Sequence, residues 1–255
     1  MAQRRLCTRE EFILTLNLYF KLPFGKMHHG TKEVIELANL IGRTSSSIAL
    51  RLGNFASCDP MLKSRGIKGM IGGTDQCQPY WDEFQDNREK LIFESEKSLA
   101  QMQHLSLEQK YNIRDIANLH GETKIRAVKT RVNQDVFRQM VMANYFGKCA
   151  LSGIDIPELL LASHIIPWSK DEHERLNPCN GICLSALYDR AFDQGLIGFD
   201  QEYKVVLSHR IIEKEGKEYY NNYFANIERK PLAKPDRYLP EKRFLEWHMD
   251  EIFLR

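Results

Sequence analysis

Residues 161–195 read LASHIIPWSKDEHERLNPCNGICLSALYDRAFDQG, and this stretch decides how the chain can fold and act. The residues before Pro167 have the composition of a strand, which the proline ends. The Asn180-Gly181 pair favours a tight turn with positive φ, after which a second short strand can run back. The apolar spacing that follows is helical and stops at Gly195, a natural C-terminal cap. The stretch therefore predicts a strand, a loop, a second strand and a helix.

Three polar side chains occupy defined places in this pattern. His164 falls near the end of the first strand, and Asp189 and Asp193 lie one helical turn apart on one helix face. Taken singly, a strand histidine is more often structural, and helical aspartates more often face solvent. Their order, with Asn-Gly between them and a helix after, favours a functional site over separate structural residues.

The motifs SHIIPW, NG and LYDRAFDQGLI resemble those of the HNH endonucleases, whose ββα-metal finger is named for His, Asn and a final His or Asn. The branch that they resemble most carries AHIxPW, then NGLxL, then LHxxFDxGLI. The CALSG segment, the N-terminal NLYFKLPFG and the C-terminal EWHMDEIF are also similar to members of this branch. The resemblance covers most of the chain and is most specific over residues 149–200.

This resemblance implies an α+β, mainly helical chain with a ββα-metal (His-Me finger) nuclease core and an N-terminal helical module. It also implies hydrolysis of DNA phosphodiester bonds with Mg²⁺, Mn²⁺ or another divalent ion, as in bacterial restriction or defence systems. His164 would be the general base that activates water, and Asn180 would brace the hairpin. Asp189 and Asp193 would hold the ion, because carboxylates suit hard cations. Further residues that can contact substrate are Tyr188, His173 and Arg190.

The sequence departs from the family pattern at the expected metal ligands. Many HNH proteins have His or Asn where Asp189 stands, and this branch often has His where Tyr188 stands. A tyrosine is not an ordinary Mg²⁺ ligand at neutral pH, because its phenol titrates near pH 10. Other branches carry an acidic ligand where this chain has Ser163. The ion could therefore be held by Asp189, by Asp193, by both, or by Ser163 with backbone groups.

No structural zinc is expected. Zinc-stapled HNH proteins have two CxxC pairs at positions that correspond here to Cys149 with Ser152 and to Ser185 with Tyr188, so one thiol is left. We expect packing to hold the hairpin instead. The residues expected to do so are Leu184, Leu187, Phe192 and Leu196.

Charge is segregated along the chain although the formal net charge is only +2. Residues 1–68 contain eleven Lys or Arg against five Asp or Glu, whereas residues 69–122 contain five against ten. Residues 123–148 are basic again and predict a helix that suits a phosphate backbone, although a solvated face or pairing between segments would explain the charges equally well. The basic residues of this helix that we consider for DNA binding are Lys124, Arg126, Lys129 and Arg131.

Residues 31–55 predict two helices joined by a short turn at Gly42 and Arg43, with Thr44 or Ser45 capping the second helix. This shape resembles a helix-turn-helix, whose second helix can contact phosphates or base edges. A helical hairpin with a solvated polar face is the alternative. The positions expected to be exposed on the second helix are Ser46, Ser47, Arg51 and Asn54.

The pattern divides the chain into four parts. We expect an N-terminal helical module at 1–68, an acidic helical spacer at 69–122, the nuclease core at 123–210 and a C-terminal extension packing on the core at 211–255. Further expected elements are helices at 9–21, 81–104, 106–119 and 241–253, an irregular connection at 59–80, and two short strands within 195–208.

Composition also indicates the redox state of the cysteines and the cellular location of the protein. The six cysteines form no CxxC pair, and the chain shows no signal peptide or membrane-spanning run, which indicates reduced thiols and a cytoplasmic protein. The expected partner is DNA in double-stranded form, with no membrane, and a homodimer is compatible with the sequence. Two alternatives stay open: a catalytically inactive DNA-binding regulator that uses residues 31–55, and an interaction protein whose hairpin is structural.

Overall fold

The protein is described by a computed structural model that covers residues 6–70, 72–114, 116 and 118–255. Its contacts separate two compact units, Met1–Val136 and Phe137–Arg255, which we describe in turn. Helices predominate, and the strands of the described residues form two antiparallel sheets of two strands each. The prediction of a mainly helical α+β chain is thus confirmed.

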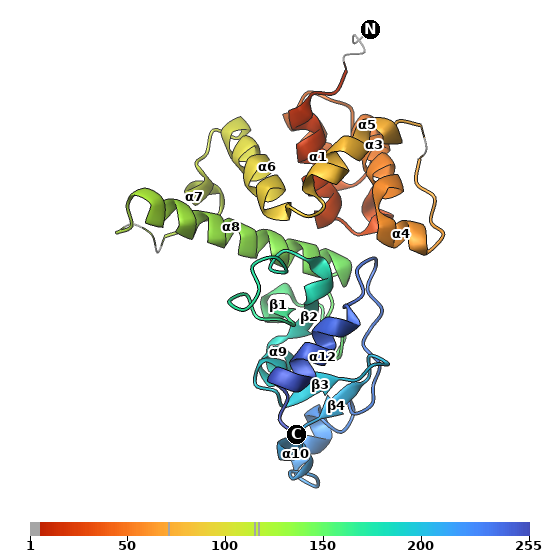
Figure 1. The fold of residues 1–255 in the computed structure, drawn as a ribbon, viewed down its shortest axis with the longest axis vertical. Helices are drawn as coiled ribbons and strands as arrows, with labels where there is room; N and C mark the ends of the chain where they lie inside the picture. The colour runs from red at the N-terminus through yellow and green to blue at the C-terminus, as the bar shows by residue number, and fades with distance from the viewer. Residues whose placement is uncertain (1–5, 71, 115, 117) are drawn as a thin grey trace. The chain divides into compact units, whose positions relative to one another are not determined.

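The first unit is helical (Figure 1). Helix α1 begins with a capping box, in which the side chains of Thr8 and Glu11 each accept from the other residue's backbone N–H. In the core of the unit, the ring of Tyr19 packs against those of Phe55 and Trp81. Its elements are α1 (Arg9–Lys21), the 3-10 helix η1 (Phe24–Lys26), α2 (Lys32–Leu40), α3 (Ser45–Cys58), α4 (Pro60–Ser64), α5 (Thr74–Phe84), α6 (Arg88–Met102), α7 (Leu107–Lys110) and most of α8 (Gly121–Asn144).

The predicted pair of helices at 31–55 is present, and Thr44 caps the second helix by accepting a hydrogen bond from the Ser47 backbone N–H. One expectation about its surface is wrong. Asn54 was expected to be exposed, but its side chain is only 1% exposed, because α5 packs against α3 and the segment before α5 runs beside it. A third helix therefore covers part of the face that a simple helical hairpin would leave open.

Helix boundaries after residue 58 differ from the expectation. The segment 59–80 contains α4 and the start of α5, because Asp59 caps a new helix by accepting from the Met61 N–H. The single helix expected at 81–104 is two helices, since Asn87 accepts from the Lys90 N–H and starts α6. In the segment 106–119, α7 ends at Lys110, and residues 115 and 117 lie outside the described residues.

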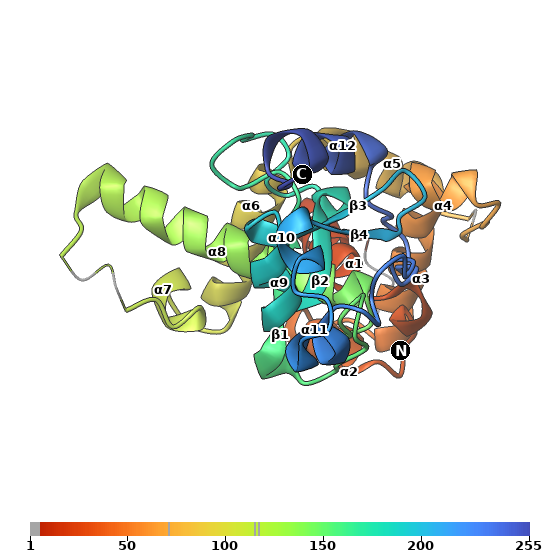
Figure 2. The same cartoon turned by 90° about the horizontal axis from the view of Figure 1, so that it is seen from below.

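The second unit holds both sheets of the described residues. After the end of α8, its elements are η2 (Pro157–Leu159), β1 (Leu160–His164), η3 (Pro178–Asn180), β2 (Gly181–Ser185), α9 (Ala186–Asp193), β3 (Ile197–Phe199), β4 (Val205–Leu207), α10 (His209–Ile212), α11 (Glu218–Tyr223) and α12 (Lys242–Glu251). β1 pairs with β2, and β3 pairs with β4, as expected for 195–208. Figure 2 shows α9 beside β1 and β2, which it also contacts.

The C-terminal helix α12 completes this unit by packing on β3. The buried His248 ring stacks on Phe192, with 3.8 Å between ring centroids, and its Nε2 is 3.0 Å from the Phe192 carbonyl. Gly195 ends α9 with φ +65°, and a Cβ there would lie 2.1 Å from the Ile252 carbonyl oxygen. Both a left-handed backbone and close approach of the chain after α12 therefore require glycine at this cap.

Candidate active site

The hairpin that carries the candidate site is not closed by a tight turn. His164 lies opposite Gly181, and Ser163 lies opposite Ile182, while a long loop joins the two strands. The expectation of a positive φ at the Asn-Gly pair is wrong, because Gly181 has an extended φ of −133°. Glycine is needed there for another reason: a Cβ would lie 2.8 Å from the Phe137 ring and 2.5 Å from Val141, both on α8.

His164 is held between aromatic rings with its ring oriented by a carbonyl. It stacks on Phe137, with 3.8 Å between centroids, and meets the edge of Trp168 at 5.5 Å. Its Nε2 is 3.0 Å from the Arg175 carbonyl oxygen, which can only accept, so Nε2 carries the proton and the Nδ1 lone pair is left available. Burial lowers the pKa of His164, and the Arg175 carbonyl opposes this in part. The imidazole is therefore neutral at pH 7, as a general base must be.

Asn180 is 1% exposed and ties the loop to the second strand. Its Oδ1 accepts from the Ile166 N–H at 2.8 Å, and its Nδ2 donates to the carbonyls of Ile166 and Glu174, each at 3.1 Å. The Glu174 carbonyl directly precedes the Arg175 carbonyl that bonds His164. Asn180 thus fixes the backbone on both sides of the loop that orients the histidine.

Asp189 and Asp193 follow one another along one face of α9, and Ser163 links the first of them to β1. The Ser163 hydroxyl is buried and donates to Asp189 Oδ1, so the residue next to His164 contacts the first of the two carboxylates. Partial removal from water raises the pKa of Asp193, and the charge of Asp189 raises it further. The C-terminal end of the helix is also unfavourable for an anion. The two carboxylates lie close enough to repel one another.

The donor set fits a hard divalent cation better than a soft one. Among the described residues, no group of three or more His, Cys, Asp or Glu side chains is placed to hold a metal ion. Two carboxylates and a hydroxyl supply oxygen ligands only, and Mg²⁺ commonly keeps several waters beside one or two carboxylates. A bound cation would also relieve the repulsion from Asp189, which adds to the effect of burial in raising the pKa of Asp193. Asp189 and Asp193, with Ser163 beside them, could therefore hold such an ion.

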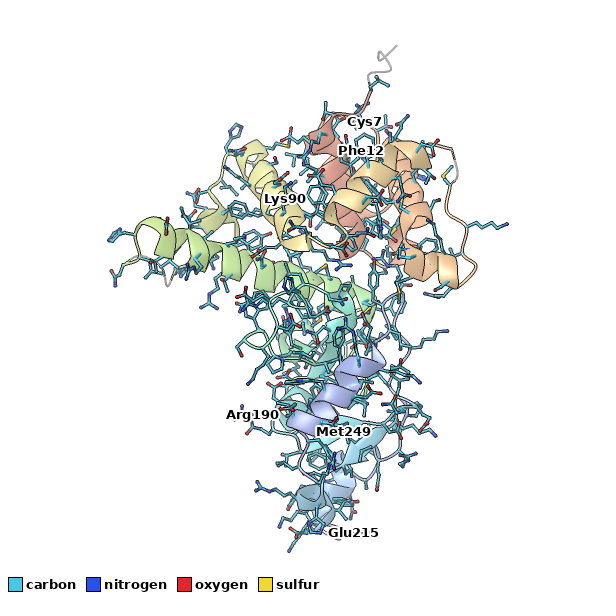
Figure 3. All side chains as sticks on the ribbon, in the orientation of Figure 1. Cys7, Phe12, Lys90, Arg190, Glu215 and Met249 are labelled. Carbon is cyan, nitrogen blue, oxygen red and sulfur yellow. The ribbon has the colours of Figure 1, made fainter. Side chains whose placement is uncertain are left out.

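The three residues considered for substrate contact differ in position. Tyr188 is buried, and its hydroxyl donates to the Tyr223 carbonyl at 2.8 Å, which places it between α9 and α11 rather than at the surface. His173 is exposed in the loop between the strands, and Arg190 is exposed on α9, where Figure 3 shows it at the edge of the unit. His173 and Arg190 are therefore accessible to a substrate.

The residues considered for DNA binding lie in the first unit and are unequally available. The Arg51 guanidinium stacks over Phe12, 4.5 Å from the ring centroid, and donates to Gln76, so Arg51 is engaged within the unit. Lys124 pairs with Glu108 at 3.3 Å and Lys129 with Glu89 at 3.1 Å. The remaining members differ in exposure: Ser46, Arg126 and Arg131 are exposed, and Ser47 is partly buried.

A cysteine contact that supports the hairpin escaped the sequence reasoning. The Cys149 sulfur accepts from the backbone N–H groups of Ser152, at 3.4 Å, and Ser185, at 3.1 Å, and so joins the CALSG turn to the start of α9. Burial would raise the pKa of Cys149, but hydrogen bonds from Ser152, Leu151 and Ser185 outweigh it and lower the pKa. The spacing of Cys149 to Ser152 was the signal that could have indicated this contact.

Packing around the hairpin follows the expected list in part. Leu184 and Phe192 are buried and Leu196 is half-buried, but Leu187, in the first turn of α9, is 44% exposed. Arg138 of α8 contributes a contact that was not expected, since its guanidinium donates to the carbonyls of Leu160, at 2.6 Å, and Pro157, at 3.0 Å. α8 therefore holds the start of β1 in place.

Comparison with known protein families matches residues 149–200 to the model of the HNH endonuclease family. A search of curated proteins finds no match. No helix within the described ranges is long and apolar enough to cross a membrane. The matched segment spans β1, β2 and α9 and contains His164, Asn180, Asp189 and Asp193. The resemblance stated from the sequence motifs is thus confirmed over residues 149–200, which are similar to the HNH endonuclease family.

Proposed function

We propose that the protein is a metal-dependent DNA endonuclease whose ββα-metal core is built by β1, β2 and α9. The observation that carries the proposal is the contact of His164 Nε2 with the Arg175 carbonyl, which leaves Nδ1 as the acceptor, on a residue next to a serine that donates to Asp189. The proposed base and the serine that contacts the proposed metal ligand Asp189 are therefore adjacent residues of β1. This combination suits hydrolysis of a phosphodiester bond.

In the proposed mechanism His164 Nδ1 takes the proton from the attacking water, while the Nε2–H stays bonded to the Arg175 carbonyl. The carbonyl also stabilises the imidazolium that forms, because it accepts from a donor that becomes charged. Asp189 and Asp193 would hold the divalent ion, which when bound stabilises negative charge on the phosphate and on the leaving oxygen. Arg190 and His173, both exposed in this unit, are available to contact the flanking backbone.

Duplex DNA is the proposed substrate, with the basic residues of α8 as backbone contacts. Arg126 and Arg131 are exposed there, and phosphate contacts of this kind need no sequence recognition. The regulator that uses residues 31–55 has less support, because Arg51 is stacked on Phe12 and Asn54 is buried. A protein that only binds DNA would also have no need for the His164 tautomer.

A plasmid assay tests the proposal. Supercoiled DNA incubated with the full chain and Mg²⁺ or Mn²⁺ should become nicked or linear, and His164→Ala should lower the rate by about 10²-fold or more, the contribution of a general base. His209→Ala is the matched control, because His209 is 70% exposed on α10 and outside the site. Absence of cleavage by the wild-type chain with either ion, or full activity of His164→Ala, would overturn the proposal.

We further propose that the nuclease acts in restriction or defence against foreign DNA. Cells that express the wild-type chain should take up foreign plasmid or support phage growth less well than cells that express His164→Ala. Equal efficiencies in the two strains would count against this role, while the nuclease activity would still be judged by the plasmid assay.

A further inference from the structure

The loop between β1 and β2 carries the carbonyl that orients His164, and the outer side of this loop is tied to α12. Arg243 Nη2 donates to Glu174 Oε1 at 2.6 Å, and Arg243 Nε donates to Glu241 Oε2, also at 2.6 Å. Asn177 Nδ2 bridges the same two carboxylates, at 2.7 Å from Glu174 and 3.3 Å from Glu241. Two loop residues and two residues at the start of α12 thus form one hydrogen-bonded group.

Glu174 contacts this group through its side chain and the site through its backbone. Its carbonyl accepts from Asn180 Nδ2 at 3.1 Å, and the next carbonyl, that of Arg175, accepts from His164 Nε2 at 3.0 Å. The carboxylate that Arg243 holds and the carbonyl that orients the base therefore belong to adjacent residues. A displacement of the Glu174 side chain would move the peptide that fixes the imidazole.

The burial of the pair favours a positional role. The Glu174 side chain is 16% exposed and that of Arg243 is 57% exposed, so the contact has one end inside the unit and one end at its surface. From residue 169 to residue 177 the loop contains no helix or strand, and its course depends on side-chain contacts. A charge-assisted pair of short hydrogen bonds is well suited to holding such a loop in one position.

We propose that Arg243, acting through Glu174, is a positioning residue that keeps the Arg175 carbonyl aligned with His164. This inference rests on the proposed function of His164 as the general base. It assigns a catalytic consequence to α12, which lies outside residues 149–200 and follows the hairpin by more than fifty residues in the chain. Arg243 itself touches neither the imidazole nor the reacting atoms.

Kinetics of plasmid cleavage by the full chain give the first test. Arg243→Gln should lower kcat by about 10-fold with KM unchanged, a smaller loss than the 10²-fold or more expected for removing the base itself. Arg243→Lys should restore most of kcat, because it keeps the charge. Lys242→Gln is the matched control: it removes a neighbouring exposed charge on α12 and should leave kcat unchanged. A rise in KM alone, or an equal loss in Lys242→Gln, would overturn the inference.

A double-mutant cycle separates this contact from other effects of Arg243. If Arg243 acts through Glu174, then Glu174→Gln should lower kcat by a similar factor, and the double variant should be no slower than either single variant. Losses that multiply in the double variant would show two independent effects and would overturn the inference.

Nitrogen NMR of the His164 ring gives a readout that does not depend on cleavage. The signals are identified by their absence in His164→Ala, and in the wild-type chain they should show a protonated Nε2 and an unprotonated Nδ1. Arg243→Gln should give a mixture of tautomers, whereas Lys242→Gln should match the wild type. Unchanged His164 signals in Arg243→Gln would overturn the inference, and absence of wild-type cleavage would instead overturn the proposed function.

Discussion

Replacement of Asn180 by alanine is the sharpest perturbation of the hairpin. The side chain is 1% exposed and makes three hydrogen bonds, one from the Ile166 N–H and two to the carbonyls of Ile166 and Glu174. Alanine would leave all three backbone groups without this partner inside the unit. The change therefore probes both stability and the geometry of the loop that orients His164.

The expected loss of stability in Asn180→Ala follows from the number of hydrogen bonds that are removed. Three hydrogen bonds, each with a net contribution of about 1 kcal/mol, give a loss of about 3 kcal/mol in the free energy of unfolding. The loss of kcat in Asn180→Ala should be about 10-fold or more, because the Glu174 carbonyl is adjacent to the Arg175 carbonyl that holds the imidazole. The stability loss is a large part of the margin of an ordinary domain.

Asn180→Asp refines this prediction because it preserves shape and changes only the donors. The carboxylate can still accept from the Ile166 N–H, but its other oxygen would face the two carbonyls at 3.1 Å. Burial and these carbonyls should raise the pKa of the introduced carboxyl above its unfolded value near 4. The aspartate variant should therefore gain stability relative to Asn180→Ala as the pH falls toward 4, and lose it as the pH rises through the raised pKa.

Urea unfolding at several pH values measures these differences, and plasmid cleavage measures kcat. Asn226→Ala is a suitable control, because this exposed side chain makes one long hydrogen bond of 3.4 Å to the Asn222 carbonyl. A loss of less than about 1 kcal/mol in Asn180→Ala together with wild-type kcat would refute the reasoning, since a typical surface substitution has an effect of that size or smaller.

Three further predictions follow from single contacts. Burial lowers the pKa of His248 to about 4 in the folded protein, whereas the unfolded imidazole has its ordinary pKa near 6.5. Between these two pH values the unfolded chain binds a proton that the folded chain does not bind. The free energy of unfolding should thus be fully retained above pH 6.5 and fall by about 3 kcal/mol as the pH drops to 4, and a urea series in which His248→Gln shows the same pH dependence would contradict this. Gly195→Ala should lower stability by more than about 2 kcal/mol, since its Cβ would lie 2.1 Å from the Ile252 carbonyl, whereas Gly216→Ala, with φ +82° and open space, should lose about 1 kcal/mol. Equal thermal shifts in the two variants would exclude the close approach as the cause. Asp193→Asn should raise the Kd for Mn²⁺ at least about 10-fold in equilibrium dialysis, and an unchanged Kd would remove this residue from the proposed ligand set.

Local patterns predicted the elements of the site because local chemistry decides them. The strand composition before Pro167, the helical spacing after Ser185 and the glycine at 195 each act over a few residues, and β1, β2 and α9 are found where these patterns place them. The motif order then brought the family resemblance, which the match over residues 149–200 confirms. Spacing also put Asp189 and Asp193 on one helix face.

Expectations failed where distant parts of the chain decide the outcome. The Asn180-Gly181 pair suggested a tight turn. Glycine is needed at 181 because a Cβ there would collide with Phe137 and Val141, which lie about forty residues earlier on α8. Asn54 was expected at the surface because two helices were considered, and the third helix that covers it begins at Thr74. The residue spacing around Gly181 or Asn54 does not indicate which distant helix packs against that residue.

The division expected at residue 210 stays a prediction. Contacts between distant parts of the chain also join residues before and after this position. Asn144 at the end of α8 accepts from the backbone N–H groups of Arg237 and Tyr238 and donates to the Tyr238 carbonyl.

The ring of His248 closes the end of α9, and Arg243 holds the loop beside His164. The proposed base and carboxylates all lie in the hairpin and α9, whereas these two contacts come from α12, which lies outside residues 149–200. Specific hydrogen bonds, and not only closeness in the chain, therefore join residues 211–255 to the segment that matches the family.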